Sequence, residues 1–80
     1  STNIDLQVIS EQTIIIKIID VMGREIWNYV EHFSEPQIKS LTWNGKNLNG
    51  KNAANGVYFI ITEGKAKTTA HKITLLKKSD

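Results

Sequence analysis

The chain has 80 residues, of which 40% are hydrophobic and none is cysteine, and its formal net charge is +2. A chain this short has room for one core, so we expect a single domain over residues 1–80 without the cleft that an enzyme needs. The absence of cysteine excludes disulfides and thiolate metal sites. No apolar run approaches the ~20 residues that span a bilayer, so we expect no transmembrane segment.

The basic residues do not form the arginine-rich face that is typical of a nucleic-acid binder. Arg24 is the only arginine of the chain. Alternating lysines on a late strand are typical of solvation and of protection of a sheet edge, so we expect no nucleic-acid partner. The late basic cluster consists of Lys65, Lys67, Lys72, Lys77 and Lys78.

Short stretches of alternating apolar and polar residues predict β-strands along most of the chain. In the second stretch, Ile14, Ile16 and Ile18 fall on one face. Ile15 and Ile19 fall on the opposite face, which predicts a central strand that is partly covered on both sides. The predicted strands cover residues 4–8, 13–19, 25–33, 38–43, 57–62 and 67–76.

These strands and the turns between them predict an all-β fold. Turn signals recur every ~8–12 residues, and no stretch has the pattern of an amphipathic helix. We expect an immunoglobulin-like β-sandwich of about seven antiparallel strands, with a small barrel as the alternative. The last two strands should form a hairpin. A helical turn within residues 29–38 remains open, although Pro36 opposes a long helix.

Two stretches have the composition of turns. Asp20 to Gly23 predicts a turn in which Gly23 takes a positive φ. Residues 44–56 contain three Asn-Gly pairs and have little to bury except Leu48, which predicts a structured loop. Calcium is a weak alternative for this loop, because its oxygen ligands would be neutral amides. Those amides belong to Asn44, Asn47 and Asn49.

No arrangement of residues predicts a catalytic site, a metal or a cofactor. His32 and His71 have no Cys, Asp or His at metal-ligand spacing, so both are interpreted as surface residues. The nucleophile elbow of a serine hydrolase and the phosphate loop of a nucleotide-binding protein are both missing. Four aromatic residues are candidates for a sugar-binding platform, although core packing explains large rings better. They are Trp27, Trp43, Tyr58 and Phe59.

Four segments together resemble a known family. They are residues 18–26, residues 41–51, residues 55–59 and residues 72–77, and the most specific parts are Trp-x-Gly-x-x-x-x-Gly at 43–50 and Gly-Val-Tyr-Phe at 56–59. Between about Gln12 and Lys78 the sequence resembles the immunoglobulin-like domain first named from the flagellar hook-capping protein. It is also similar to the C-terminal sorting domains of the type IX secretion system of the Bacteroidetes.

The resemblance implies a sandwich at the C-terminus of a larger secreted or surface protein, whose terminal strands and Gly-Val-Tyr hairpin are recognised by secretion machinery. The matching positions are Gly23, Gly56, Tyr58, Lys72, Ile73, Leu75 and Lys77. The chain departs from the family at Asn44 and Asn47, where aspartate is usual, and no Pro-Asn-Pro precedes Ile4. The basic ending resembles the usual one, so the segment is interpreted as the C-terminus of its parent.

These observations lead to three functional hypotheses. The first is a non-catalytic sorting or anchoring module that routes a protein through the periplasm to the cell surface or medium. The second is a passive immunoglobulin-like structural or assembly module that contacts only neighbouring domains of the parent chain. The third is a carbohydrate-binding module. None of the three has a small-molecule substrate for catalysis.

Overall fold

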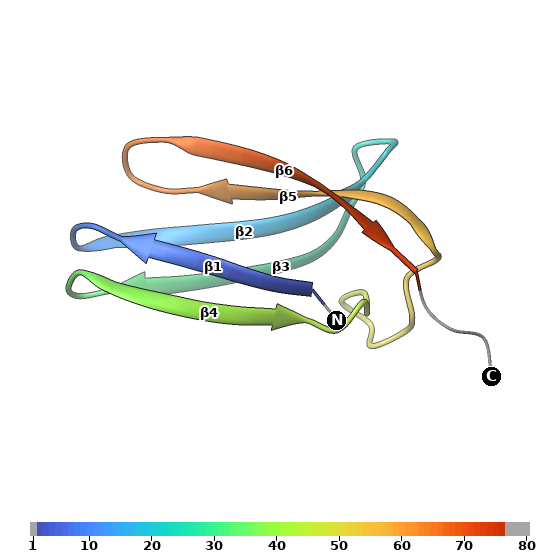
Figure 1. Cartoon of the computed structure of the whole chain (residues 1–80), viewed down its shortest axis with the longest axis horizontal. Coiled ribbons are helices and arrows are strands. Elements are labelled where there is room, and N and C mark those ends of the chain that lie inside the picture. Colours follow the sequence, from blue (N-terminus) through green and yellow to red (C-terminus); the bar gives the residue numbers. More distant parts are fainter. Residues whose placement is uncertain (1, 77–80) are drawn as a thin grey trace.

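The chain folds into two layers, each of which is a sheet of antiparallel strands (Figure 1). The structure, a computed structural model, describes residues 2–76, and within them it has six strands and no helix. The predicted immunoglobulin-like sandwich is therefore confirmed, with six strands in this part of the chain where about seven were expected. The strands are β1 (Thr2–Val8), β2 (Gln12–Asp20), β3 (Glu25–Phe33), β4 (Gln37–Trp43), β5 (Gly56–Glu63) and β6 (Thr68–Leu75).

One layer has four strands and the other has two. The larger sheet has the order β3-β2-β5-β6, and the smaller consists of β1 and β4. The prediction of a central second strand is confirmed, because β2 pairs with both β3 and β5. The predicted final hairpin is also confirmed, since β5 and β6 pair from Gly56 opposite Leu75 to Glu63 opposite Thr68.

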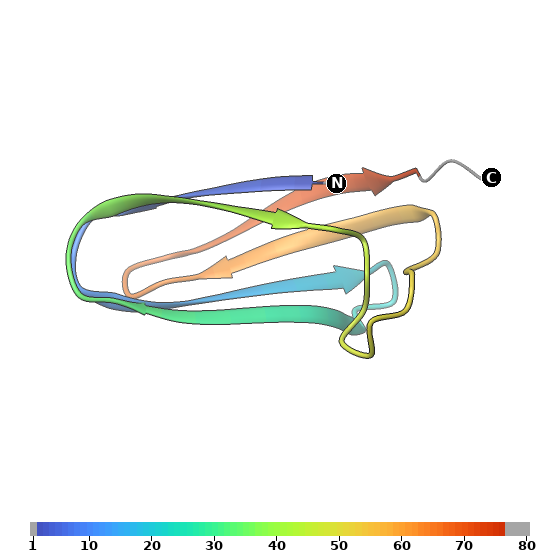
Figure 2. The ribbon, with the colours of Figure 1, turned by 90° about the horizontal axis from the view of Figure 1, so that it is seen from below.

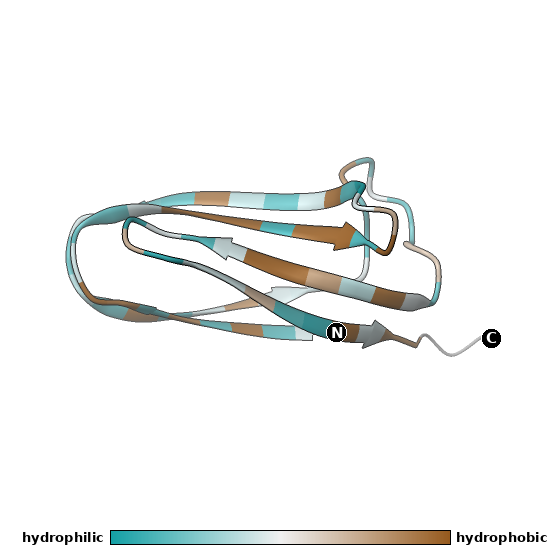
Figure 3. Ribbon diagram, turned by 90° about the horizontal axis from the view of Figure 1, so that it is seen from above, coloured by the Kyte–Doolittle hydropathy of each residue, from teal (hydrophilic) through white to brown (hydrophobic). Residues whose placement is uncertain are grey.

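The core lies between the two layers and follows from the alternation of the strands. On β2 the buried residues are Ile14, Ile16 and Ile18, and the last two have no exposed surface. Apolar and polar bands alternate along the strands in Figure 3, as expected where each strand has one buried face. The full set of buried residues is Ile4, Leu6, Val8, Ile14, Ile16, Ile18, Phe33, Trp43, Tyr58, Ile60 and Leu75.

The connections between strands gather at the two ends of the sandwich (Figures 1 and 2). We call the end with residues 20–24, residues 44–55 and the end of β6 the loop end. The opposite end, with residues 9–11, residues 34–36 and residues 64–67, is the turn end. The helical turn left open for residues 29–38 is not formed, because this stretch completes β3, turns at Pro36 and enters β4.

Among residues 2–76 the structure has no helix that would cross a membrane.

Candidate functional site

Most of the residues implied by the family resemblance meet at the loop end. Gly56 pairs with Leu75, and Tyr58 pairs with Ile73 on the neighbouring strand. On its other side Tyr58 pairs with Asp20, the last residue of β2, three residues before Gly23. Lys72, next to Ile73, pairs with Phe59 and is exposed. Lys77 lies outside the described residues.

The turn that contains Gly23 is built on the side chain of Asp20. Asp20 Oδ1 accepts hydrogen bonds from the amides of Met22 and Arg24, both at 2.9 Å, and Oδ2 accepts one from Arg24 Nε at 2.7 Å. The amide of Asp20 donates to the Arg24 carbonyl, and the amide of Gly23 donates to the Asp20 carbonyl. Gly23 takes a φ of 83°, a conformation that favours glycine, so the predicted positive φ is confirmed.

These bonds stabilise the ionised form of the Asp20 carboxyl. The backbone amide of Arg24 is the main cause of a pKa below the ordinary value of 3.8, and it outweighs the opposing effect of partial desolvation. The Arg24 guanidinium and the Met22 amide lower the pKa further. The turn is therefore held by a carboxylate that stays charged at neutral pH, whereas the Arg24 side chain is largely exposed.

The same turn occurs a second time at the loop end. The amides of Asn49 and Lys51 donate to Asn47 Oδ1 at 2.9 and 3.0 Å, as those of Met22 and Arg24 do to Asp20. The amide of Asn47 donates to the Lys51 carbonyl, the amide of Gly50 donates to the Asn47 carbonyl, and Gly50 has a φ of 77°. Asp20–Arg24 and Asn47–Lys51 are thus one five-residue turn used twice.

The two turns are connected directly and carry exposed apolar side chains. The amide of Leu48 donates to the carbonyl of Ile26, two residues after the first turn, at 3.0 Å. Val21, Met22 and Leu48 are 68%, 76% and 58% exposed. The expectation that Leu48 is buried is therefore wrong, and Ala53 packs against the core from this loop instead.

Tyr58 lies in the core and contacts the loop end from there. Its ring meets the ring of Trp43 edge to face, with centroids 5.7 Å apart, and only 6% of the residue is exposed. Its hydroxyl donates to the Ala54 carbonyl at 2.5 Å, and Trp43 Nε1 donates to the Lys46 carbonyl at 2.9 Å. Two buried aromatic residues therefore fasten the loop 44–55 at both of its ends, which confirms the prediction of a structured loop.

The seven implied residues thus differ in what a partner can touch. Tyr58 and Leu75 are buried and Ile73 packs against the core, so these three shape the surface from beneath. Lys72 projects from the opposite face of β6 and is exposed. Strand β6 is an edge of the larger sheet, because in the described part of the chain it pairs with β5 alone. Among the implied residues in the described part of the chain, Gly23 and Lys72 are exposed, and the backbone edge of β6 is accessible beside Lys72.

Within residues 2–76 the asparagine and histidine side chains do not come together in a metal or catalytic site. Asn44 and Asn47 use their side-chain oxygens to accept backbone amides of their own turns. His32 lies on the surface between Thr13 and Glu11, with which its ring nitrogens interact. His71 is also exposed, so both histidines are surface residues as predicted.

The proposed sugar platform is not assembled either. Trp43 and Tyr58 are buried between the sheets, whereas Phe59 lies on the outer face of the larger sheet. Trp27 stacks on Tyr29, and both pack against the core. The interpretation of the large rings as core packing is confirmed for Trp27, Trp43 and Tyr58. It is wrong for Phe59, whose side chain lies outside the sandwich.

The comparisons with known proteins identify a family. The family model described as "Secretion system C-terminal sorting domain" matches residues 1–76. The comparison with curated proteins and the comparison with solved structures find no match. The likeness to the domain of the flagellar hook-capping protein has no support among these findings.

A sorting tail of this kind is a non-catalytic signal for the type IX secretion system, which implies a Bacteroidetes source. It also implies contact with the secretion machinery and a secreted or cell-surface destination. The match covers nearly the whole chain, including all six strands. This protein belongs to the family of secretion system C-terminal sorting domains.

Proposed function

We propose that this domain is the C-terminal module of a larger protein and directs that protein through the periplasm to the type IX translocon. The observation that carries the proposal is the family match over residues 1–76. The loop end supports it, since most of the residues that the family resemblance implies lie there around one edge strand. The parent protein then reaches the cell surface or the medium.

In this proposal the implied residues have two different roles. Gly23, Gly56, Tyr58 and Leu75 hold the shape of the loop end, because they are buried or set the backbone conformation. The machinery contacts the β6 edge, where unpaired backbone groups are available for strand addition, and the exposed ammonium group of Lys72. Ile73 positions that edge. Lys77 lies outside the described residues and adds a second basic residue after Lys72 in the sequence.

The first experiment tests the sorting role as a whole. Residues 1–80 are fused to the C-terminus of a fluorescent reporter that carries a signal peptide, and the fusion is expressed in a Bacteroidetes host. We expect the reporter at the cell surface or in the medium, and in the periplasm when the type IX system is disabled. A folded fusion that stays in the periplasm of the intact host would contradict the proposal.

A pair of charge reversals tests the contact surface. Lys72→Glu places an anion on the β6 edge and should lower export, whereas Lys65→Glu makes the same change at the turn end and should leave export unchanged. Circular dichroism of the purified domains checks that both variants fold. Equal export of the two variants would remove Lys72 from the contact surface.

A second candidate function is favoured by the outer face of the larger sheet. Residues that oppose each other in register share a face, and this places Ile15, Ile19, Phe59 and Ile61 together, outside the sandwich. These side chains are only half-buried, and Val30 beside them is 58% exposed. Such a face fits a neighbouring domain of the parent chain, as a passive structural module would. Retention of the folded reporter in the periplasm would favour this function.

A further inference from the structure

The exposed apolar side chains of the domain concentrate at the loop end. Seven large apolar residues within residues 2–76 are at least 58% exposed, and four of them lie at this end. These four are Val21, Met22, Leu48 and Leu76. Exposed apolar groups that gather in one place mark a surface for a protein or a membrane. The loop end therefore has the features of an interaction surface.

Three of these side chains stand on the tips of two fixed turns. Val21 and Met22 belong to the turn Asp20–Arg24, and Leu48 belongs to the turn Asn47–Lys51. In each turn two backbone amides donate to the side-chain oxygen of the first residue. The amide of Leu48 also donates to a carbonyl of β3, which fixes the second turn beside that strand (Figure 2). Because the tips are already ordered, little conformational entropy is lost when they are covered.

Basic side chains accompany the apolar tips. Each turn ends in a basic residue, Arg24 in the first and Lys51 in the second, and Lys46 precedes the second turn. The Arg24 side chain is 76% exposed, and both lysines are exposed as well. Each turn thus presents an apolar and a cationic side chain to the same surroundings.

Acidic side chains do little to offset these cations. The Asp20 carboxylate accepts amides of its own turn, and its side chain is only 14% exposed. Glu25, the first residue of β3, accepts a hydrogen bond from Asn28 at 2.8 Å. Residues 20–24 and 44–55 contain three basic residues and one acidic residue. The turn end is balanced, because its three segments contain two lysines and two glutamates.

Apolar tips beside cations fit the surface of an anionic membrane. Interfacial binding to membranes depends on buried apolar area together with attraction to anionic lipids. The exposed apolar side chains stand on three separate segments of the chain. A lipid interface is fluid and adapts to separate apolar tips, whereas a protein would need a pocket for each of them. A membrane is therefore the partner that these observations favour.

We propose that the loop end docks on the surface of an anionic phospholipid membrane. Val21, Met22 and Leu48 enter the interface, where apolar groups reach a depth of about 5–10 Å. Arg24 and Lys51 meet the lipid phosphates. The surface shares the loop end with residues that are implied in sorting, but docking does not rest on the sorting function. Vesicle binding and export are separate measurements, so either proposal can fail alone.

The test is co-sedimentation of the 80-residue chain with phospholipid vesicles. One set of vesicles contains phosphatidylcholine and phosphatidylglycerol in equal amounts, and the other contains phosphatidylcholine alone. We expect binding to the anionic vesicles to be at least about tenfold tighter, because each basic residue near an anionic surface adds attraction. Added salt should weaken this binding, since it screens the charges.

A pair of double variants tests the apolar contact. Met22→Ser with Leu48→Ser removes two apolar tips, whereas Ile9→Ser with Ile38→Ser makes the same changes at and beside the turn end. The control side chains are similarly exposed, at 70% and 78%. The first double variant should bind anionic vesicles at least about tenfold more weakly, because two apolar side chains no longer leave water. The control should bind as the unchanged chain does.

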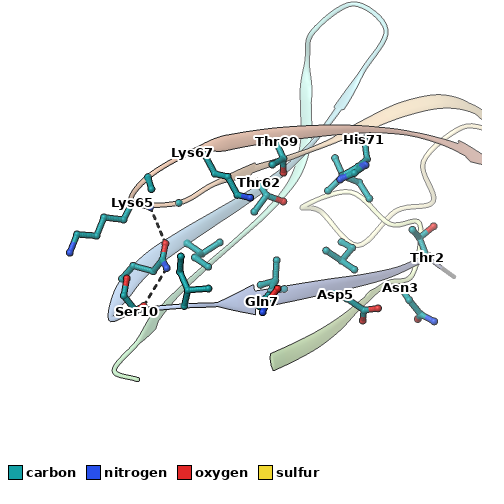
Figure 4. Close-up of a pocket in the computed structure, with 18 of the residues that line it drawn as sticks. Thr2, Asn3, Asp5, Gln7, Ser10, Thr62, Lys65, Lys67, Thr69 and His71 are labelled. Carbon is teal, nitrogen blue, oxygen red and sulfur yellow. Dashed lines mark hydrogen bonds between the residues drawn. The ribbon is translucent and has the colours of Figure 1, made fainter. Parts of the chain in front are cut away.

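A pair of charge reversals tests the cationic contact. Lys51→Glu reverses a charge at the loop end, and Lys65→Glu makes the same change at the turn end. The Lys65 side chain extends away from the sandwich (Figure 4), and its bond to Gln12 uses the backbone amide, which the substitution keeps. Lys51→Glu should weaken binding at least about tenfold, whereas Lys65→Glu should leave it nearly unchanged.

Three results would overturn the proposal. The first is no binding of the folded chain to anionic vesicles. The second is equal binding by the two double variants, because charge alone would then hold the chain at the vesicle. The third is reporter export that requires Met22 and Leu48 although the chain binds no vesicle, since the surface would then contact a protein. Circular dichroism shows whether each variant is folded, and Lys51→Glu gives an answer even if a double variant is not.

Discussion

At the scale of single residues, the polar atoms of two buried aromatic rings decide the position of the longest loop. The Tyr58 hydroxyl and the Trp43 indole nitrogen each donate to a backbone carbonyl of residues 44–55. A buried aromatic residue with a polar group needs such a partner, and here the partner is the loop. The rings therefore contribute both to the core and to the loop end.

This arrangement predicts that Tyr58→Phe and Tyr58→Ala have different effects. Tyr58→Phe keeps the ring and leaves the Ala54 carbonyl without its donor, which should lower the free energy of unfolding by about 1 kcal/mol. Tyr58→Ala also removes a ring that packs on Trp43 and should cost about 3–5 kcal/mol. Urea denaturation followed by tryptophan fluorescence measures both. Equal losses would mean that the hydroxyl determines the whole effect.

Asp20 gives a prediction for acid stability. Its pKa in the folded chain is lowered, mainly by the amide of Arg24, so folding favours the ionised carboxyl. The resulting stabilisation is fully present above the ordinary pKa of 3.8 and is lost as the pH falls through the lower folded pKa. Asp20→Asn, which keeps an acceptor oxygen but not the charge, should be less stable than the unchanged chain at pH 7.

Denaturation of both chains between pH 7 and pH 2 measures this effect. The difference in the free energy of unfolding should stay constant down to about pH 4 and shrink below it, because protonation removes the charge that the substitution also removes. Glu11→Gln serves as a control on the surface at the turn end. A difference that does not change with pH would contradict the assigned role of the carboxylate.

At the scale of elements, the loop end is built from one turn that occurs twice. The sequences Asp20-Val21-Met22-Gly23-Arg24 and Asn47-Leu48-Asn49-Gly50-Lys51 share an Asp or Asn at the first position, a glycine at the fourth and a basic residue at the fifth. Each first residue accepts two amides of its own turn. This shared spacing was readable in the sequence, although only the first turn was predicted in detail.

The repetition predicts that the two turns respond alike to substitution. Gly23 and Gly50 have φ values of 83° and 77°, and a β-carbon at either position would meet no atom within 4 Å. Gly23→Ala and Gly50→Ala should therefore cost only the backbone strain, about 1–2 kcal/mol each. Gly23→Asn and Gly50→Asn should cost less, since asparagine tolerates this conformation. Thermal unfolding of the four variants tests the equivalence, which a large difference between the two sites would refute.

At the scale of the whole molecule, the two sheets differ in how well their strands are paired. Strands β2 and β5 each pair with two neighbouring strands. Within the described residues, β1 pairs with β4 alone and β4 with β1 alone. We expect hydrogen exchange of backbone amides to be slowest in β2 and β5 and faster in β1 and β4, because local opening frees the smaller sheet first. Exchange measured by mass spectrometry on peptic fragments tests this order, and equal protection of both sheets would contradict it.

The sequence predicted the strands well because their alternation reflects burial on one face. The central place of β2 followed from Ile15 and Ile19, which have apolar neighbours on the second face as well. The pairing of β1 with β4 could not be predicted from the alternation of apolar residues, because pairing between strands far apart in the sequence produces no local pattern. The seventh expected strand was inferred from the usual form of the sandwich, not from a pattern in the residues.

The candidate site was predicted less completely. The resemblance selected Tyr58 and Leu75, and the structure shows that these two are buried. A sequence motif cannot distinguish a residue that contacts a partner from a buried residue that holds the contact surface in shape, because both kinds of residue belong to the same motif. An open groove between β1 and the β5–β6 hairpin, lined by Leu6, Ile60 and Thr69 among others, had no sequence signal, because it lies where the two-stranded sheet leaves part of the four-stranded sheet uncovered.

The pairing of β1 with β4 also has a consequence for synthesis on the ribosome. Asp5 and its partner Ser40 are 35 residues apart in the sequence, so β1 emerges long before its neighbour exists. Translation proceeds at roughly 5–20 residues per second, which leaves Ile4, Leu6 and Val8 without β4 for a matter of seconds. During that interval the nascent chain displays an unpaired apolar strand, the kind of segment that chaperones shield from aggregation.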